Sequence, residues 1–300
     1  MPRPIDALIH PDALAHNLAR ARAHAPDARV WAVVKADAYG HGIERAFAGL
    51  RGADGLALLD LAEAERLRAL DWRGPILLLE GVFEPRDLEL CSRLGLWHAV
   101  HCDAQIDMLA AHKTNVPHRV FLKMNSGMNR LGFAPDQYRS AWTRLNALPQ
   151  VDEISLMTHF GNADGPLGIA DAMAVFAAVT SDLPGERSLA NSAALQAFPG
   201  SQGDWVRPGG MLFGLSTFAR KMGQDLGLRP VMSLSTRLIS IQHLVAGDRV
   251  GYGGTYVCPH AMRIGIAACG YADGYPRVVP CGNEGPVTPV LVDGVRTRIV

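Results

Sequence analysis

The first three quarters of the chain alternate between short apolar runs and longer amphipathic stretches. Most runs precede a segment with apolar residues at helical spacing, such as DLAEAERLRAL at 60–70. The eight runs lie at 31–35, 55–59, 75–81, 98–101, 120–126, 154–160, 187–192 and 205–210. Eight strand-then-helix units are what a (β/α)8 TIM barrel requires, so we predict an α/β barrel over residues 1–228. A doubly wound sheet also alternates in this way, but it rarely needs eight units.

After residue 228 the pattern changes to alternation with a period of two and no intervening helix. The alternating segments are VMSLSTRLISI, DRVGYGGTYV, MRIGIAACGYADGY and TPVLVDGVRTRIV. Asp293-Gly294 in the last segment is typical of a two-residue hairpin turn. We therefore predict a mostly-β domain over residues 229–300. Its last strand runs into Val300 without a closing partner, so we expect this domain to be truncated at its C-terminal end.

Composition and charge argue against two broad classes of protein. The chain carries 29 basic and 29 acidic residues and has no basic tract, which argues against a protein that binds a nucleic-acid backbone. It has no run of about 18 apolar residues and no signal-peptide core, which argues against membrane insertion. The five cysteines form no CxxC pair and are odd in number. We interpret them as buried small hydrophobic residues in a cytoplasmic protein, not as disulfides or a zinc site.

Polar residues stand where several of the predicted strands end, which is the edge at which barrel enzymes carry out their chemistry. Loops after the seventh and eighth strands of such barrels often bind phosphate. The polar residues and glycines at these ends are Lys35, Arg130, His159, Asn191, Ser192, Arg207, Gly209 and Gly210. The set suits anion binding and proton transfer, although a polar residue also often marks a strand end without a function.

Two lysines lie inside apolar runs and need a reason to be there. Only four of the 29 basic residues are lysines, and Lys35 and Lys123 are in WAVVK and VFLKM. Burial lowers the pKa of a lysine and supplies a neutral amine that forms a Schiff base with a carbonyl. Pyridoxal phosphate is the common partner of such an amine. An aldolase-type lysine with its own carbonyl substrate and a purely structural lysine are the alternatives.

The stretch AVVKADAYGHG at 32–42 is similar to the cofactor-attachment motif of the alanine racemases. Six further segments resemble blocks of that family in the family's order: LKMNSGMNRLGF (122–133), MTHFGNAD (157–164), LANSAA (189–194), DWVRPGGMLFG (204–214), GDRVGYGGTY (247–256) and CGYADGYPR (269–277). Seven ordered blocks are highly specific. Barrel-type decarboxylases with the same cofactor share the lysine but not the tyrosine block.

The resemblance implies an isomerase, a pyridoxal 5'-phosphate-dependent racemase that interconverts L-alanine and D-alanine through an external aldimine. The product would supply peptidoglycan precursors or D-alanine catabolism. Lys35 would hold the cofactor and act as one base, and Tyr252 would act as the second base on the opposite face of the substrate. The family delivers this tyrosine from the partner subunit, so a homodimer is expected.

The resemblance also implies a set of cofactor contacts. Tyr39, Ser192 and the amides near Gly209 and Gly210 would hold the phosphate, and Asn191 would lie beside them at the cofactor.

Three basic side chains and one histidine complete the implied site. Arg207 would face the pyridine nitrogen, and His159 would lie beneath the ring and orient Arg207. Arg130 would assist the second base and bind the substrate carboxylate. Lys123 matches a position that is carbamylated in some members, where the carbamate braces Arg130.

The chain departs from the family pattern in three places. Asn125 and Ser126 stand where Asp-Thr is usual, and Ser188 stands where histidine is frequent. The family also continues beyond Val300 into a Met-Asp segment and a late tyrosine. A racemase of serine or of a broader range of amino acids is one alternative. A pyridoxal phosphate-binding barrel without turnover is the other, although such carriers lack both the β domain and the tyrosine block.

Overall fold

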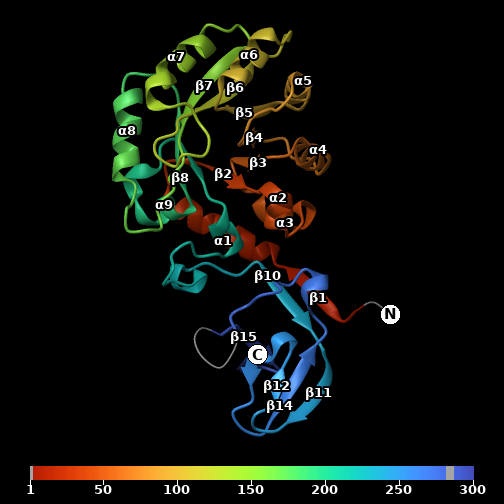
Figure 1. The fold of residues 1–300 in the computed structure, drawn as a ribbon. Helices are drawn as coiled ribbons and strands as arrows, with labels where there is room; N and C mark the ends of the chain where they lie inside the picture. Colours follow the sequence, from red (N-terminus) through yellow and green to blue (C-terminus); the bar gives the residue numbers. More distant parts are fainter. Residues whose placement is uncertain (1–2, 282–286) are drawn as a thin grey trace. The chain divides into compact units, whose positions relative to one another are not determined.

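A computed structural model describes residues 3–281 and 287–300, and it divides the chain into two compact units. The larger unit spans Ile9–Met232, and the smaller unit combines residues 1–8 with Ser233–Val300. Figure 1 shows the two units in sequence colours. Each unit is described here by itself. The prediction of a boundary between residues 228 and 229 remains a prediction.

The larger unit contains a closed barrel of eight parallel strands in sequential order, which confirms the predicted fold class. The strands are β2 (Arg29–Val33), β3 (Gly55–Leu58), β4 (Ile76–Leu78), β5 (Leu96–Val100), β6 (His118–Lys123), β7 (Val151–Met157), β8 (Arg187–Asn191) and β9 (Trp205–Arg207). Each strand overlaps one of the eight apolar runs. The runs are apolar throughout because both faces of a parallel barrel strand are buried.

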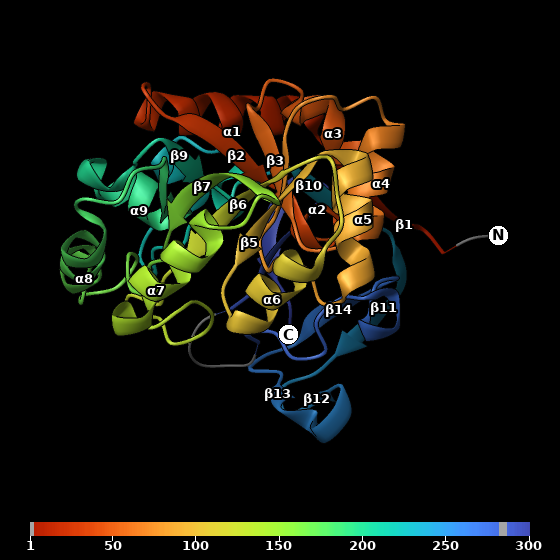
Figure 2. The same ribbon diagram turned by 90° about the horizontal axis from the view of Figure 1, so that it is seen from above.

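Helices surround the barrel, as Figure 2 shows. They are α1 (Pro11–His24), α3 (Ile43–Leu50), α4 (Leu61–Ala69), α5 (Pro85–Leu94), α6 (Asp103–Ala111), α7 (Pro135–Asn146), α8 (Ala170–Thr180) and α9 (Ser192–Ala197). Their buried residues recur at helical spacing, as in Ala64 and Leu67 of α4. Short 3-10 turns follow α9, at Pro199–Ser201, and β9, at η2 (Gly210–Phe213) and η3 (Gly223–Leu226).

Large aromatic side chains fill the interior of the barrel. Trp31 stacks on Trp205 with 4.3 Å between ring centroids, and the edges of Trp97 and Phe121 meet Trp31 at 5.4 and 6.0 Å. Gly55 makes room for this packing, because a Cβ atom there would lie 2.1 Å from the Trp31 ring. The filled interior leaves the ends of the strands as the place where polar side chains gather.

The described residues of the smaller unit form four two-stranded sheets, which agrees with the predicted mostly-β character. β1 (Ile5–Ile9) pairs with β10 (Met232–Thr236), β11 (Leu238–Leu244) with β14 (Met262–Ala267), β12 (Arg249–Val250) with β13 (Tyr256–Val257), and β15 (Pro289–Val292) with β16 (Val295–Arg298). Asp293 and Gly294 both have positive φ, which confirms the predicted hairpin turn. The pattern of apolar and polar residues did not predict β1. Its residues are partly or fully exposed and show no alternation in burial.

Across the described residues, no helix has the length and apolar character needed to cross a membrane.

The five cysteines were predicted to be buried. All five are free thiols, and Cys91 and Cys258 are buried as expected. Cys281 is exposed and Cys102 and Cys269 are partly exposed, so the prediction that all five are buried is wrong. These three follow strands or lie in loops, where an apolar neighbourhood in sequence does not ensure burial.

Candidate active site

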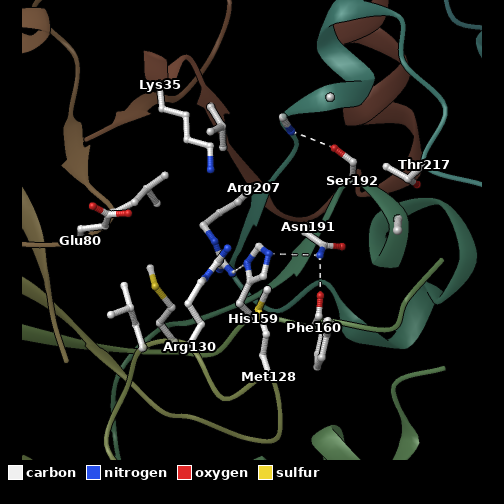
Figure 3. A pocket seen from close by; sticks show the side chains of 18 of the residues that line it. Lys35, Glu80, Met128, Arg130, His159, Phe160, Asn191, Ser192, Arg207 and Thr217 are labelled. Atoms are coloured by element: carbon white, nitrogen blue, oxygen red, sulfur yellow. Dashed lines mark hydrogen bonds between the residues drawn. The ribbon is translucent and has the colours of Figure 1, made fainter. Parts of the chain in front are cut away.

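A cavity of about 270 Å³ opens at the C-terminal ends of the barrel strands, and Figure 3 shows its walls. Every site residue predicted within residues 1–228 lies in its lining: Lys35, Tyr39, Lys123, Arg130, His159, Asn191, Ser192, Arg207, Gly209 and Gly210. The structure therefore brings together predicted residues from five of the eight strand ends, those of β2, β6, β7, β8 and β9.

Lys35 lies just after β2 and begins an unusual turn, α2 (Lys35–Tyr39). The four residues Ala36–Tyr39 have φ between 52° and 56°, so the turn is left-handed. A left-handed conformation costs a non-glycine residue about 1–2 kcal/mol, so this segment stores several kcal/mol. Lys35 itself is half-buried and points into the cavity (Figure 3). The sequence suggested that Lys35 is enclosed by the apolar run that precedes it. The structure shows that it is not enclosed.

The far end of the same turn places Tyr39 against the glycine pair after β9. A Cβ atom on Gly209 would lie 2.2 Å from the Tyr39 hydroxyl oxygen, so only glycine permits this approach. The Tyr39 ring packs on Phe213, with 4.8 Å between centroids. Burial raises the pKa of Tyr39, which keeps its phenol protonated and able to donate a hydrogen bond.

Ser192, the first residue of α9, is tied to the same glycine loop. Its Oγ accepts hydrogen bonds from the backbone N–H groups of Gly209 at 2.9 Å and Met211 at 3.4 Å. A hydroxyl has two acceptor positions and one donor, so the O–H of Ser192 remains to donate toward the cavity. The hydroxyl Oγ1 of Thr217, in the same lining, is buried without a hydrogen-bond partner in the described part of the chain. Two hydroxyl donors thus line this side of the cavity.

Arg207, at the end of β9, is buried and held by neutral acceptors. Its Nη1 donates to Ser188 Oγ at 2.6 Å, and its Nη2 donates to the carbonyl oxygen of Thr158 at 2.6 Å. Burial lowers the pKa of Arg207 to about 10, so the side chain is still a cation at neutral pH. Ser188 replaces the frequent histidine of the family with a hydroxyl that accepts from this arginine.

His159 lies beside Arg207 and is neutral. Its Nδ1 lies 3.3 Å from Arg207 Nη2, which only donates, so Nδ1 accepts in this contact. Burial, followed by the charges of Arg207, Lys123, Arg130 and Lys35, lowers the pKa of His159 to about 2. Asn191 Nδ2 lies 3.4 Å from His159 Nε2 and donates to the carbonyl of Phe160 at 2.9 Å. At neutral pH this histidine therefore carries no charge.

Lys123, in β6, is the buried lysine that the sequence predicted, with 7% of its surface exposed. Burial and then the positive charges of Arg207 and Arg130 lower its pKa to about 8. The carboxylate of Glu80, which follows β4 and lines the same cavity, raises the pKa of Lys123 and so opposes this shift. Near neutral pH, Lys123 is therefore close to the point at which it loses its charge.

Arg130 is exposed and reaches the cavity from the loop after β6 (Figure 3). Asn125 organises that loop: its Oδ1 accepts from the N–H groups of Gly127 at 3.2 Å and Asn129 at 2.9 Å. Ser126 Oγ shares a hydrogen bond of 2.6 Å with Thr158 Oγ1. The two departures from the family's Asp-Thr pair therefore leave local loop contacts in place.

Tyr252 belongs to the smaller unit, so it is not among the residues that line the barrel cavity. It begins the 3-10 turn η4 (Tyr252–Gly254) and is 95% exposed. Gly251, Gly253 and Gly254 around it all have positive φ, which explains the glycines of the GYGG motif. Tyr252 lines a surface hollow of the smaller unit with Tyr271 and Arg277. On its own unit, this phenol is presented to the outside.

The cavity is also lined by residues that the sequence pattern did not predict. Glu80 and Thr217 are the most informative, together with Asp164 and a set of apolar lining residues: Leu59, Leu79, Met128 and Leu131. Glu80 follows an apolar strand, so the rule that identified Lys35 also applies to it. Thr217 lies in a loop that no strand pattern identifies, so its position required the structure.

The chain matches two family models, described as the alanine racemase N-terminal domain over residues 9–217 and the alanine racemase C-terminal domain over residues 231–300. It is 68% identical over 304 aligned residues to alanine racemases of Polaromonas sp. and Acidovorax sp., and the alignments cover 100% of this chain and 82% of each relative. Its fold is similar to the biosynthetic alanine racemase of Pseudomonas aeruginosa, with a TM-score of 0.93 and 42% identity over 99% of this chain and 82% of that one.

Proposed function

The chain belongs to the alanine racemase family, and on that premise we propose which of its residues carry the family's reaction. Members of the family depend on pyridoxal phosphate and interconvert L-alanine and D-alanine. The alternatives of a serine or broad-range racemase and of a barrel without turnover are not favoured, because the relatives at 65–68% identity are alanine racemases.

The cavity fits the charged parts of pyridoxal phosphate. The free O–H of Ser192, the unpartnered hydroxyl of Thr217 and the protonated phenol of Tyr39 are donors for a phosphate group. At Gly209 a side chain would collide with Tyr39, so the backbone approach there is open only to glycine. We propose that Tyr39, Ser192, Gly209 and Gly210 hold the phosphate, and that Asn191 fixes the adjacent loop through its N-cap bond to Ala194.

When bound, the cofactor withdraws electrons from the substrate α-carbon and acidifies its proton. Arg207 sets how strongly this happens, because we propose that its guanidinium faces the pyridine nitrogen. Arg207 remains a cation at neutral pH and has donors only, so it leaves that nitrogen without a proton. His159 keeps Arg207 in place from the side. The result is moderate electron withdrawal, which suppresses transamination.

Racemisation needs a proton removed on one face of the α-carbon and returned on the other, so two bases are required. We propose that Lys35 Nζ serves as the base on one face and holds the cofactor between turnovers. Tyr252 serves on the other face, supplied by the partner subunit of a homodimer. Its exposed position on the smaller unit suits a residue that works in a second copy. Arg130, at the mouth of the cavity, binds the substrate carboxylate and assists Tyr252.

We further propose that Lys123 carries a carbamate. An amine reacts with carbon dioxide only in its neutral form, and burial lowers the pKa of Lys123 to about 8. The resulting anion would lie among Arg207 and Arg130 and brace the latter. Mass spectrometry of the protein in bicarbonate, against Lys123→Arg, tests this assignment by an added mass that the variant lacks.

The observation that carries the proposal is the convergence of Lys35, Ser192 and Arg207 on one cavity (Figure 3). The test follows the circular dichroism of L-alanine with the protein and added pyridoxal phosphate. We expect the signal to decay to zero with D-alanine in the product. Lys35→Ala should abolish both this decay and the visible absorbance of attached cofactor, whereas Lys113→Ala, at an exposed lysine, should change neither. Attached cofactor in Lys35→Ala would contradict the assignment.

A further inference from the structure

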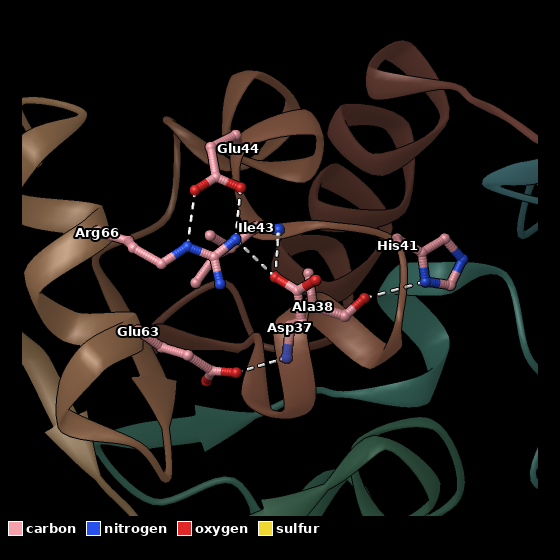
Figure 4. Close-up of polar contacts among 7 residues, drawn as sticks. All are labelled: Asp37, Ala38, His41, Ile43, Glu44, Glu63 and Arg66. Carbon is pink, nitrogen blue, oxygen red and sulfur yellow. Dashed lines mark hydrogen bonds and ion pairs between the residues drawn. The ribbon is translucent and has the colours of Figure 1, made fainter.

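The left-handed turn Ala36–Tyr39 joins two proposed site residues, Lys35 at its start and Tyr39 at its end. Four consecutive non-glycine residues with positive φ do not stay in this conformation unless their surroundings impose it. Figure 4 shows the polar contacts around the turn. The question is which side chain imposes the conformation.

Several contacts close the turn on its outer side. Asp37 Oδ1 accepts from the Ile43 N–H at 3.0 Å and from Arg66 Nη2 at 2.9 Å, and Arg66 also binds Glu44 at 2.5 Å. His41 Nδ1 lies 2.9 Å from the carbonyl of Ala38 and donates to it. Asp37, Arg66 and Glu44 are partly exposed, so water screens these contacts.

Glu63 makes a different kind of contact with the turn. It lies on α4, is 8% exposed, and its Oε1 accepts the backbone N–H of Asp37 at 2.5 Å. Its other oxygen, Oε2, is buried and has no partner within the described residues. Burial raises the pKa of Glu63, and the hydrogen bond from Asp37 opposes that shift. A buried carboxylate with one oxygen that forms no hydrogen bond contributes little to stability. Stability alone therefore does not explain why Glu63 occupies this position.

We propose that Glu63 is a positioning residue for the reaction. By accepting the Asp37 N–H, it holds the turn in the conformation that presents the Lys35 amine and the Tyr39 hydroxyl to the cavity. The inference rests on the proposed function of Lys35 and Tyr39. It follows that the oxygen that accepts the hydrogen bond is what matters, and that the charge of Glu63 is not needed.

The test compares Glu63→Leu, which leaves the Asp37 N–H without an acceptor, with Glu63→Gln, which keeps one. Glu63→Ala repeats the first change with a smaller side chain. Glu65→Gln is the matched control, because Glu65 lies on the same helix, is half exposed and pairs with Arg93 on the surface. Hydrogen exchange of residues 36–39 is measured in cofactor-free protein, and pyridoxal phosphate affinity is measured by visible absorbance.

We expect Glu63→Leu and Glu63→Ala to speed exchange at the Asp37 amide and to weaken pyridoxal phosphate binding, each about tenfold or more. Turnover number should fall more than KM rises, because a displaced amine loses orientation and not substrate contacts. Glu63→Gln, like Glu65→Gln, should stay within about twofold of the original in the exchange rate of the Asp37 amide, in pyridoxal phosphate affinity and in turnover number. A merely structural residue would lower the melting temperature of every variant without this pattern.

Three results would overturn the inference: unchanged exchange in Glu63→Leu, faster exchange without weaker cofactor binding, or a Glu63→Gln variant as impaired as Glu63→Leu. Failure of the proposed function looks different. In that case the unsubstituted chain binds no pyridoxal phosphate at Lys35, while the exchange of residues 36–39 still responds to Glu63→Leu and still supports the contact between Glu63 and the turn.

Discussion

The two units place their proposed chemistry in opposite environments. In the barrel, Arg207 and Lys123 are buried and the cavity walls are fixed by contacts within one chain. In the smaller unit, Tyr252 is 95% exposed, and the strands β10 and β16 are mostly exposed as well. The difference agrees with the proposed division of roles, in which the barrel of one copy holds the cofactor and the exposed Tyr252 would act in a second copy.

Removing the hydroxyl of Tyr252 should cause the largest loss of racemisation among the variants that still bind the cofactor. Tyr252→Phe should lower racemisation about 10²–10⁴-fold, the usual contribution of a general base. Lys35 still removes the proton of one enantiomer, so exchange of the α-hydrogen in deuterated water should continue for that enantiomer alone. Proton nuclear magnetic resonance measures both quantities.

The control for this variant lies in the same motif. Tyr256 is 1% exposed, and its hydroxyl lies 3.6 Å from Met262 Sδ and 3.5 Å from Arg298 Nη2. Tyr256→Phe should therefore leave racemisation within about twofold of the original, because both contacts of the removed hydroxyl are long and weak. Equal loss of activity in the two variants would mean that exposure does not separate a catalytic tyrosine from a structural one.

Reversing the charge at Arg207 tests the barrel half of the comparison. Arg207→Glu lets the pyridine nitrogen take up a proton, so electron withdrawal becomes stronger and side transamination should rise. We expect the ratio of pyruvate formed to alanine racemised to increase about tenfold or more, because a single charged hydrogen bond of this size is worth over 1.4 kcal/mol. Arg187→Glu, on the outer part of β8, is the control, and an unchanged ratio in Arg207→Glu would refute the role of Arg207.

Acid should destabilise the barrel because burial keeps three of its histidines neutral in the folded protein. Burial lowers the pKa of His98 to about 3, of His118 to about 4 and of His159 to about 2, whereas the unfolded chain binds these protons near pH 6.5. The unfolded state therefore binds more protons below pH 6.5, and stability falls as the pH falls. Each histidine contributes at most about 1.4 kcal/mol per pH unit.

Urea denaturation at pH 7 and pH 5 measures this loss for the barrel. His98→Asn should reduce the difference between the two pH values, because it removes one of the protons that the unfolded chain takes up. A free energy of unfolding that is equal at pH 5 and pH 7 would show that these histidines are protonated in the folded protein.

The smallest effect is expected at the loop that carries Arg130. Asn125→Ala removes the acceptor for two backbone N–H groups, so the loop loosens by about 1 kcal/mol. KM for alanine should rise a few-fold while cofactor absorbance is unchanged. Asn125→Asp, which restores the family's usual residue and keeps the acceptor, should match the original, and a large rise in KM for that variant would contradict the account.

Much of the barrel and its cavity could be predicted from the sequence. Eight apolar runs indicated eight strands, and polar residues at their ends, such as Lys35 and Arg207, do line one cavity. The rule works because parallel strands end at the same edge of a barrel. Strand β1 was missed because its burial does not alternate.

Other features depend on contacts that no local pattern records. Glu63 lies in the segment DLAEAERLRAL, whose apolar spacing indicates a helix but does not indicate a buried charge, and yet Glu63 is buried against the backbone of Asp37. The left-handed turn Ala36–Tyr39 contains no glycine that would indicate positive φ. Thr217 lies in an irregular loop. In each case tertiary contacts override the local preference.

On the proposed mechanism, a complete site needs the barrel of one copy and Tyr252 of another. Mixing two inactive variants, Lys35→Ala and Tyr252→Phe, after joint refolding tests this directly by racemisation of L-alanine. Half of the dimers then contain one of each chain, and one of their two sites holds both Lys35 and Tyr252, so about a quarter of the original activity should return. No return of activity in verified mixed dimers would mean that both bases belong to the same chain.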